Sequence, residues 1–312
     1  MKHPRPPTPR PLRPFAWSGW LLEVPQTLRP IKVQGGTESG SVALGDEDGR
    51  RLDLVWATVT RRRFDGKRFA KRRLRRVVGG RRREVDKATD SLRHVVFDPL
   101  LVHRDESTGR DRFVGFVPTT RRVLDVAWHD PANRRTDIDP SVESLVDQPA
   151  DKPQKWAFFA VSFITPTGFK YSESILNLGD MRVSLKRPGR PRSDLVVRHI
   201  YPASLALARG DLEHWLDSQI KAIAKTHRPP RSRRRGPAGV PIDTAVGPGV
   251  VCDVFLRRGV RLTSWRRPRV MRMWTINDTQ RDRLVALQLA GDPDEFEPVL
   301  GELIEGLGWA ES

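Results

Sequence analysis

Hydrophobic and polar residues alternate with a period of two in several stretches of this chain, a pattern typical of strands that bury one face. In one stretch Leu52, Leu54 and Trp56 share a face, and the segment from Asp46 to Gly49 before it has the composition of a hairpin tip. Antiparallel sheets are therefore expected. Further strands are predicted at Val42 to Leu44, Phe113 to Val117, Val123 to Trp128, Val250 to Leu256, Val270 to Ile276 and Leu284 to Leu289.

Apolar residues recur at helical spacing in other segments. Phe64 to Arg83 has only a thin apolar seam, and nearly every other position in it is Lys or Arg. Asp139-Pro140 is typical of a helix start, and we expect a short helix after it with Val146 on its apolar face. Two more helices are predicted, from Asp211 to Ala224 and after Asp294.

The order of these elements occurs twice. An aromatic stretch leads to Pro25 in the first half and to Pro166 in the second, and a hairpin and a helix follow each time. We interpret this order as a tandem duplication. The predicted fold class is α+β, with two similar domains, each an antiparallel sheet packed with a long helix and a C-terminal helix. The predicted divisions are a basic, proline-rich arm at 1–14, a first domain at 15–148, a linker at 149–154 and a second domain at 155–309.

The same order of elements carries a resemblance to a known family. In each half an aromatic strand ends at a proline, Pro25 or Pro166, and a hairpin follows around Gly49 or Gly189. Each half closes with a helix, after Pro140 or Pro298. In these points the chain resembles the Mog1/PsbP-like superfamily. The resemblance implies a binding or assembly factor rather than an enzyme. Many relatives are exported, whereas the basic N-terminus here lacks the apolar segment of a secretory signal.

Positive charge dominates the composition. The 312 residues include 56 Lys and Arg against 38 Asp and Glu, a formal net charge of +18. A high-GC genome would explain the preference for Arg but not the net charge, which favours a polyanionic partner such as nucleic acid or an acidic membrane face. No segment approaches the roughly 20 apolar residues of a membrane span. We therefore expect a cytoplasmic protein.

The basic residues gather in four clusters, and we predict that they bind phosphate groups with little dependence on base sequence. The cluster from Arg257 to Arg272 also contains Trp265, with Trp274 just beyond it, and aromatic rings beside cations suit stacking on unpaired bases. The predicted nucleic-acid-binding residues are Lys67, Arg68, Lys71, Arg72, Arg75, Arg76, Arg190, Arg192, Arg233, Arg234, Arg266 and Arg267.

Other interpretations remain open from the sequence. Gly189-Arg190-Pro191 resembles the core of an AT-hook, a minor-groove reader, although Pro188 departs from that pattern. The basic helix also suits adsorption to anionic lipid. A scaffold that docks an acidic protein partner, as a subunit of a larger complex, is a further alternative. A metal-dependent nuclease would use acidic residues such as Asp125, Asp130, Asp137 and Asp139.

Enzymatic chemistry has little support in the residues. The chain has one cysteine, Cys252, which excludes an intramolecular disulfide and a cysteine-based zinc site, and its strand-like surroundings suggest a buried apolar role. The seven histidines are scattered without the spacing of metal ligands. No catalytic residue, metal or cofactor is predicted. The expected function is that of a non-enzymatic accessory or assembly protein that binds nucleic acid.

Overall fold

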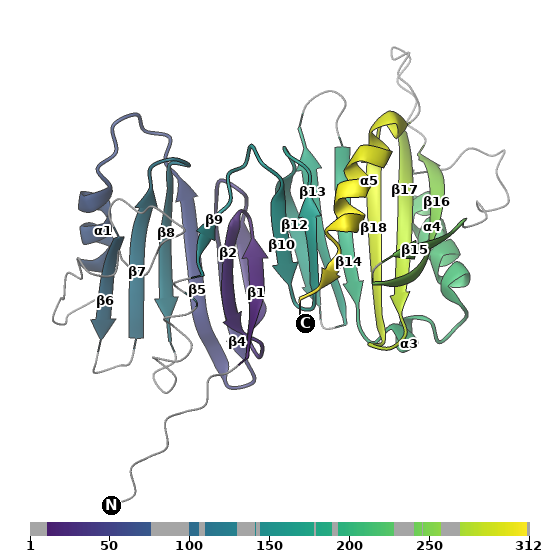
Figure 1. Ribbon diagram of the computed structural model, residues 1–312, viewed down its shortest axis with the longest axis horizontal. Coiled ribbons are helices and arrows are strands. Elements are labelled where there is room, and N and C mark those ends of the chain that lie inside the picture. Colours follow the sequence, from purple (N-terminus) through teal and green to yellow (C-terminus); the bar gives the residue numbers. More distant parts are fainter. Residues whose placement is uncertain are drawn as a thin grey trace, which may run out of the picture. The chain divides into compact units, whose positions relative to one another are not determined.

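The computed structural model combines three antiparallel sheets with helices that pack on them, which confirms the predicted α+β class (Figure 1). It describes residues 11–75, 100–105, 110–129, 141, 144–177, 179–188, 193–227, 240–244, 246–256 and 269–310. The chain divides into two compact units. Unit 1 is Met1–Ser162 with Ala310–Ser312, and unit 2 is Phe163–Trp309.

The larger sheet of unit 1 has the strand order β3-β4-β5-β8-β7-β6. Leu52, Leu54 and Trp56 are at most 2% exposed, which confirms the predicted buried face. Asp46 pairs with Gly49 across the predicted hairpin tip. The strands are β3 (Arg29–Gly35), β4 (Ser39–Asp46), β5 (Gly49–Thr58), β6 (Leu100–Asp105), β7 (Arg110–Val117) and β8 (Arg122–Trp128).

A smaller group of strands in unit 1 has the order β10-β1-β2-β9. These strands are β1 (Leu12–Trp17), β2 (Trp20–Pro25), β9 (Val146–Asp147) and β10 (Gln154–Phe158). The predicted helix containing Val146 is wrong at that residue, because Val146 lies in β9 and pairs with Leu21 of β2. Asp139 and Pro140, the proposed helix start, lie outside the described residues.

A buried ion pair connects the two groups of strands in unit 1. Nη1 of Arg122 on β8 lies 2.6 Å from Oδ1 of Asp147 on β9, and Nη2 donates to the carbonyl oxygen of Ser18 at 2.7 Å. The guanidinium also lies over the ring of Trp20, 4.3 Å from its centroid. Gly19, at φ 82°, makes room, because a Cβ there would come within 2.8 Å of Arg122 Nη1. Burial lowers the pKa of Arg122 and raises that of Asp147, since it disfavours both charged forms.

Unit 2 contains a sheet of order β12-β13-β14-β18-β17-β16-β15. The two edge strands, β12 and β15, were not predicted, because neither contains a fully buried residue and the apolar alternation is weak. The strands are β12 (Lys170–Asn177), β13 (Asp180–Arg187), β14 (Ser193–Ile200), β15 (Val240–Thr244), β16 (Gly247–Leu256), β17 (Arg269–Asp278) and β18 (Arg283–Gly291). β19 (Gly308–Trp309) lies beside β11 (Val161–Thr165).

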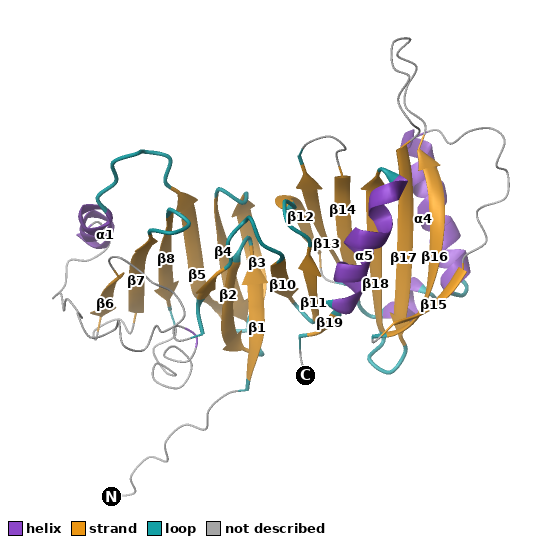
Figure 2. Ribbon diagram, turned by 45° about the horizontal axis from the view of Figure 1, so that its top comes forward, coloured by secondary structure: helices purple, strands orange, loops and turns teal. Residues whose placement is uncertain are grey.

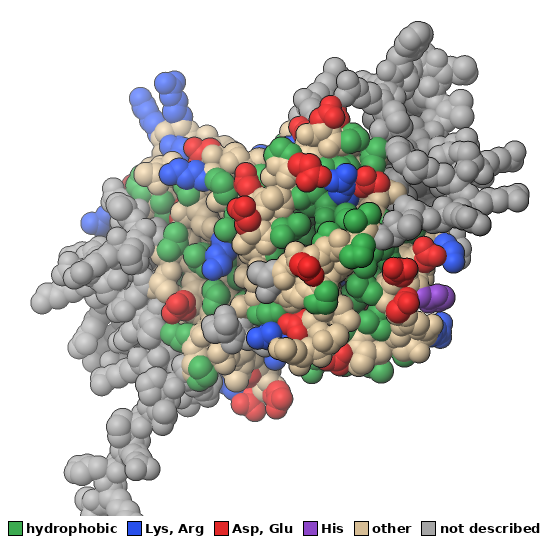
Figure 3. All heavy atoms as spheres, turned by 45° about the vertical axis from the view of Figure 1, so that its right-hand side comes forward, with side chains coloured by type: hydrophobic (Ala, Val, Ile, Leu, Met, Phe, Trp, Pro, Cys, Tyr) green, Lys and Arg blue, Asp and Glu red, His purple; other side chains and the backbone are tan. Residues whose placement is uncertain are grey.

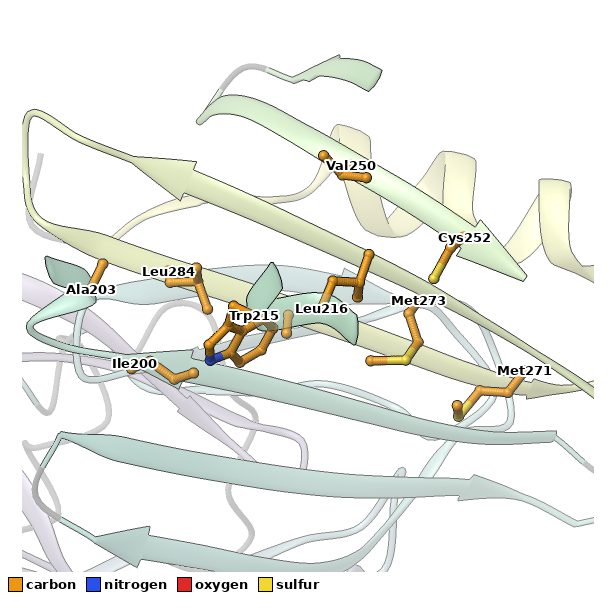
Figure 4. Packing of buried hydrophobic residues seen from close by; sticks show 10 residues of the cluster. Ile200, Ala203, Trp215, Leu216, Val250, Cys252, Met271, Met273 and Leu284 are labelled. Carbon is orange, nitrogen blue, oxygen red and sulfur yellow. The ribbon is translucent and has the colours of Figure 1, made fainter. Parts of the chain in front are cut away.

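Two predicted helices cover opposite faces of the unit 2 sheet (Figure 2). α4 (Leu212–His227) packs Trp215 and Leu216 against a cluster that includes Met273, as Figure 4 shows. α5 (Phe296–Glu305) buries Phe296, Val299, Leu300 and Leu303 on the other face. The short helix α3 (Ala203–Ala206) and the 3₁₀ turn η2 (Pro293–Glu295) precede α4 and α5, respectively.

Cys252 belongs to the core beneath α4 and is 4% exposed. Burial, with the nearby charges of Asp253 and Asp217, raises the pKa of its thiol to about 12. The thiol therefore stays protonated near neutral pH and is not an activated nucleophile. This agrees with the buried apolar role expected from the sequence.

Replacing Arg122 by Met should destabilise the protein by about 3 kcal/mol, because Asp147 would stay buried without its counter-charge. Chemical denaturation measures this loss. The double variant Arg122→Met Asp147→Leu removes both charges and should recover most of the stability. A single variant as stable as the wild type would show that the pair does not hold the strands together.

Candidate nucleic-acid interface

The predicted basic helix begins as expected and is described from Gly66 to Arg75 as α1. It lies against β7 and β6 (Figure 1). Ala70, which is 1% exposed, packs on Val114, and Phe69 and Leu74 flank this contact. Because Ala70 has the smallest apolar side chain, the helix backbone comes close to the sheet and needs only a narrow apolar seam.

The start of α1 is fixed by aromatic packing and by a capping carboxylate. The ring of Phe64 packs at a tilt against those of Phe69 and Phe116, with centroid distances of 5.6 and 4.9 Å. Asp65 Oδ1 accepts a hydrogen bond from the backbone N–H of Arg68 at 2.8 Å, as an N-cap residue does. Asp65 is the only acidic residue from position 61 to 75. Its carboxylate is thus committed to the helix end.

Asp125 on β8 determines which side of α1 faces the sheet. Its Oδ2 accepts from Arg73 Nε of α1 at 2.7 Å, and its Oδ1 accepts from Arg112 Nε of β7 at 2.7 Å. The Asp125 side chain is only 7% exposed. One arginine of the helix, Arg73, is therefore held toward the sheet by a buried carboxylate, whereas Lys67, Arg68 and Arg72 are exposed.

The outward side of α1 carries exposed cations. Lys67, Arg68 and Arg72 are exposed, and among the described residues none of them forms an ion pair. Arg61, Arg62 and Arg63, just before the helix, are also exposed. We call these six residues the α1 basic surface.

The α1 basic surface as defined by these six residues leaves out the other predicted phosphate-binding residues. Lys71 is partly buried and has an interaction of its own, and Arg75 is the last residue of α1. The remaining predicted residues lie outside the described part of the chain: Arg76, Arg190, Arg192, Arg233, Arg234, Arg266 and Arg267. The AT-hook-like segment from Gly189 to Pro191 lies outside it as well.

Arg187 and Arg272, which belong to two of the predicted basic clusters, form ion pairs within the fold. Arg187 bonds to Glu295 and lies over the ring of Phe169, 5.3 Å from its centroid. Arg272 bonds to Asp253 at 2.6 Å and also to Glu297. Trp274 is only 4% exposed, so its ring belongs to the core and not to a surface that could stack on bases.

The described residues contain few features that a metal-dependent nuclease or a membrane-spanning protein would need. Asp125, a candidate nuclease residue, already binds two arginines, and Asp130, Asp137 and Asp139 lie outside the described ranges. Within those ranges, His, Cys, Asp and Glu side chains do not gather in threes that could hold a metal ion. Among the helices that the structure describes, none has the length and apolar character to cross a membrane.

Comparison with known proteins identifies structural neighbours only. No family model and no curated protein matches the chain. One solved structure that resembles it is the Ran-binding protein Mog1p of Saccharomyces cerevisiae, with 10% identity, a TM-score of 0.32 and coverage of 50% of this chain and 95% of that chain. Another is the immunity protein TplEi of the Pseudomonas aeruginosa T6SS, with 11% identity, a TM-score of 0.35 and coverage of 96% and 98%.

The neighbours thus include Mog1p and an immunity protein, each with a TM-score well below 0.5. At TM-scores below 0.5, neither neighbour's binding properties are transferred to this chain.

Replacing Asp125 by Ala should loosen α1, because Arg73 and Arg112 lose their shared buried counter-charge. Hydrogen exchange of the α1 amides should accelerate about tenfold, equivalent to about 1.4 kcal/mol. Asp46→Ala is the control: it removes one of the two carboxylates that bond to Arg51 in the β4–β5 hairpin and should leave α1 exchange unchanged. Equal exchange of α1 in wild type and Asp125→Ala would exclude the anchoring role.

Proposed function

We propose that this protein is a non-enzymatic accessory or assembly protein that binds the phosphate backbone of nucleic acid through the α1 basic surface. The observation that carries the proposal is the exposure of Lys67, Arg68 and Arg72 on one helix that Asp125 and Val114 hold to the sheet, without ion-pair partners among the described residues. Contacts of this kind read charge and backbone spacing rather than base edges.

The arrangement is unfavourable for the helix itself. Arg68 and Arg72 are one helical turn apart, and like charges at this spacing cost about 0.2–0.5 kcal/mol. Lys67 and Arg68 lie in the first turn, where the helix dipole favours negative charge. Fold stability therefore does not account for these cations, whereas a polyanion would relieve their repulsion and interact favourably with the helix N-terminus.

The contrast with α4 points in the same direction. α4 occupies the corresponding place after the β13–β14 hairpin and packs a broad apolar face that includes Trp215 and Leu216. α1 has instead a narrow apolar contact around Ala70 and a basic outer side. A helix at this place can pack with a broad apolar face, as α4 does, so packing does not require the basic side of α1. That side is therefore a better candidate for a functional surface than α4.

We also propose that the chain arose by tandem duplication, with domains at 15–148 and 155–309. In support, the path β3-β4-β5, α1, β6-β7-β8 parallels the path β12-β13-β14, α4, β16-β17-β18, and β5 pairs with β8 as β14 pairs with β18. The matching buried rows are Leu44, Leu52 and Trp128 in unit 1 and Leu185, Leu195 and Leu289 in unit 2.

Homologous sequences test the duplication. Profiles built separately for the two halves should match each other, with Leu44 aligned to Leu185 and Leu52 aligned to Leu195. The buried rows require this register, because a shift by one residue would turn the apolar side chains to the other face. Profiles that fail to match, or that match in a different register, would contradict a common origin.

Charge reversal tests the binding function. The variant Lys67→Glu Arg68→Glu Arg72→Glu should bind a double-stranded DNA oligonucleotide more weakly than the wild type. Its plot of log affinity against log salt should be flatter by about 2–3, because each lost phosphate contact removes about 0.9 from the slope. Fluorescence anisotropy across a salt series gives both quantities.

The matched control reverses three other exposed cations, Arg29, Lys170 and Lys221, with the same change in net charge. This control variant should keep most of the wild-type slope. If both triple variants lose affinity equally, binding depends on net charge and not on α1. If the wild type does not bind nucleic acid at low salt, the proposed function is wrong.

A further inference from the structure

Unit 2 contains an open groove of about 650 Å³, whose lining includes no residue of the α1 basic surface. One wall is α5, and the other walls and the floor come from β15, β16 and β17. Its volume is within the range of about 300–1,000 Å³ that is typical of ligand sites. On the face of the protein that is visible in Figure 3, acidic and hydrophobic side chains lie next to one another.

The inner surface of the groove is largely apolar. Ile242 of β15, Val251 of β16 and Ile304 of α5 line it and remain partly exposed. Gly301, midway along α5, also faces the groove. A Cβ built on Gly301 would meet no atom within 4 Å, so the helix is bare at this point and there is room for a side chain from a binding partner.

The rim of the groove is acidic. Four carboxylates and one guanidinium line it: Asp243, Asp253, Glu297, Glu305 and Arg272. Arg272 is shared between Asp253 and Glu297. Among the described residues, Asp243 and Glu305 form no ion pair, and both are exposed. The described residues that line the groove thus carry more negative than positive side chains, in a chain with a formal net charge of +18.

We propose that this groove binds an extended, basic segment of another protein, which places an apolar side chain beside Gly301 and Lys or Arg side chains toward the acidic rim. Charge complementarity selects a cationic occupant. The apolar floor requires that the occupant also bury an aliphatic or aromatic group. A polyanion would be repelled by the rim, so this site is distinct from the α1 basic surface.

The spacing of the acids along α5 defines the occupant further. Glu297 and Glu305 are eight residues apart, which corresponds to about 12 Å along the helix, with Gly301 at the midpoint. In an extended chain, at about 3.3 Å per residue, the same span is covered by about four residues. The matching pattern is therefore Lys-x-apolar-x-Lys. Alternation puts these three side chains on one face of a strand.

The test uses the full-length protein and a fluorescein-labelled peptide, Gly-Lys-Ser-Leu-Ser-Lys-Gly, in an anisotropy titration at low salt. The peptide with Glu in place of both Lys residues, and the peptide with Ser in place of Leu, are the ligand controls. The Lys-Leu-Lys peptide should bind at least tenfold more tightly than either one. Equal binding of all three peptides would overturn the proposal.

Matched protein variants locate the binding site. Glu305→Lys should weaken peptide binding about fivefold, whereas Glu302→Lys, which makes the same charge change on an exposed part of α5 outside the groove lining, should change it less than twofold. Equal effects of the two variants would show that the peptide responds only to overall charge and would overturn the assignment.

Substitutions at Gly301 test the apolar contact. Gly301→Phe should fill the groove and weaken binding at least tenfold. Gly301→Ala adds only a methyl group, favours the helix, and should bind within about threefold of the wild type. Circular dichroism melting verifies that both variants fold. A folded Gly301→Phe variant with wild-type affinity would exclude the groove as the binding site.

Discussion

The carboxylate of Asp125 is the contact on which the candidate interface depends. It lies on β8, is nearly buried, and holds Arg73 of α1 and Arg112 of β7 at the same time. With Ala70 seated on Val114, this ion pair sets the rotation of α1 about its axis. Lys67, Arg68 and Arg72 of the same helix are exposed to solvent, and they lie on a helix rather than on a loop.

The elements predicted correctly are those whose apolar faces are buried within a sheet or beneath a helix. β5 shows its alternation directly, and α4 shows its 3.6-residue period, because both bury one full face. The sequence does not predict β12 and β15, because these edge strands bury few side chains and so show little apolar alternation. Val146 was placed in a helix on local capping signals, whereas its structure is decided by pairing with β2 and by the ion pair of the next residue, Asp147, with Arg122.

The candidate site was predictable only in part. The apolar seam at Ala70 and Leu74 predicts that Lys67, Arg68 and Arg72 face solvent, as they do. The inward turn of Arg73 depends on Asp125, 52 residues further along the chain, and no local pattern reveals it. The acidic groove was beyond prediction for the same reason, since its lining comes from four elements that only the fold brings together. Together the two proposed surfaces suit an accessory protein that links nucleic acid to a basic protein segment.

Lysine footprinting tests the central claim most directly. The protein is acetylated with and without a saturating double-stranded DNA oligonucleotide, and modification at each lysine is measured by mass spectrometry. If α1 carries the phosphate contacts, Lys67 becomes protected in the complex, while Lys170 and Lys221, which are also exposed in the unbound protein, react as before. Protection of Lys170 and Lys221 with unchanged reactivity at Lys67 would contradict the account.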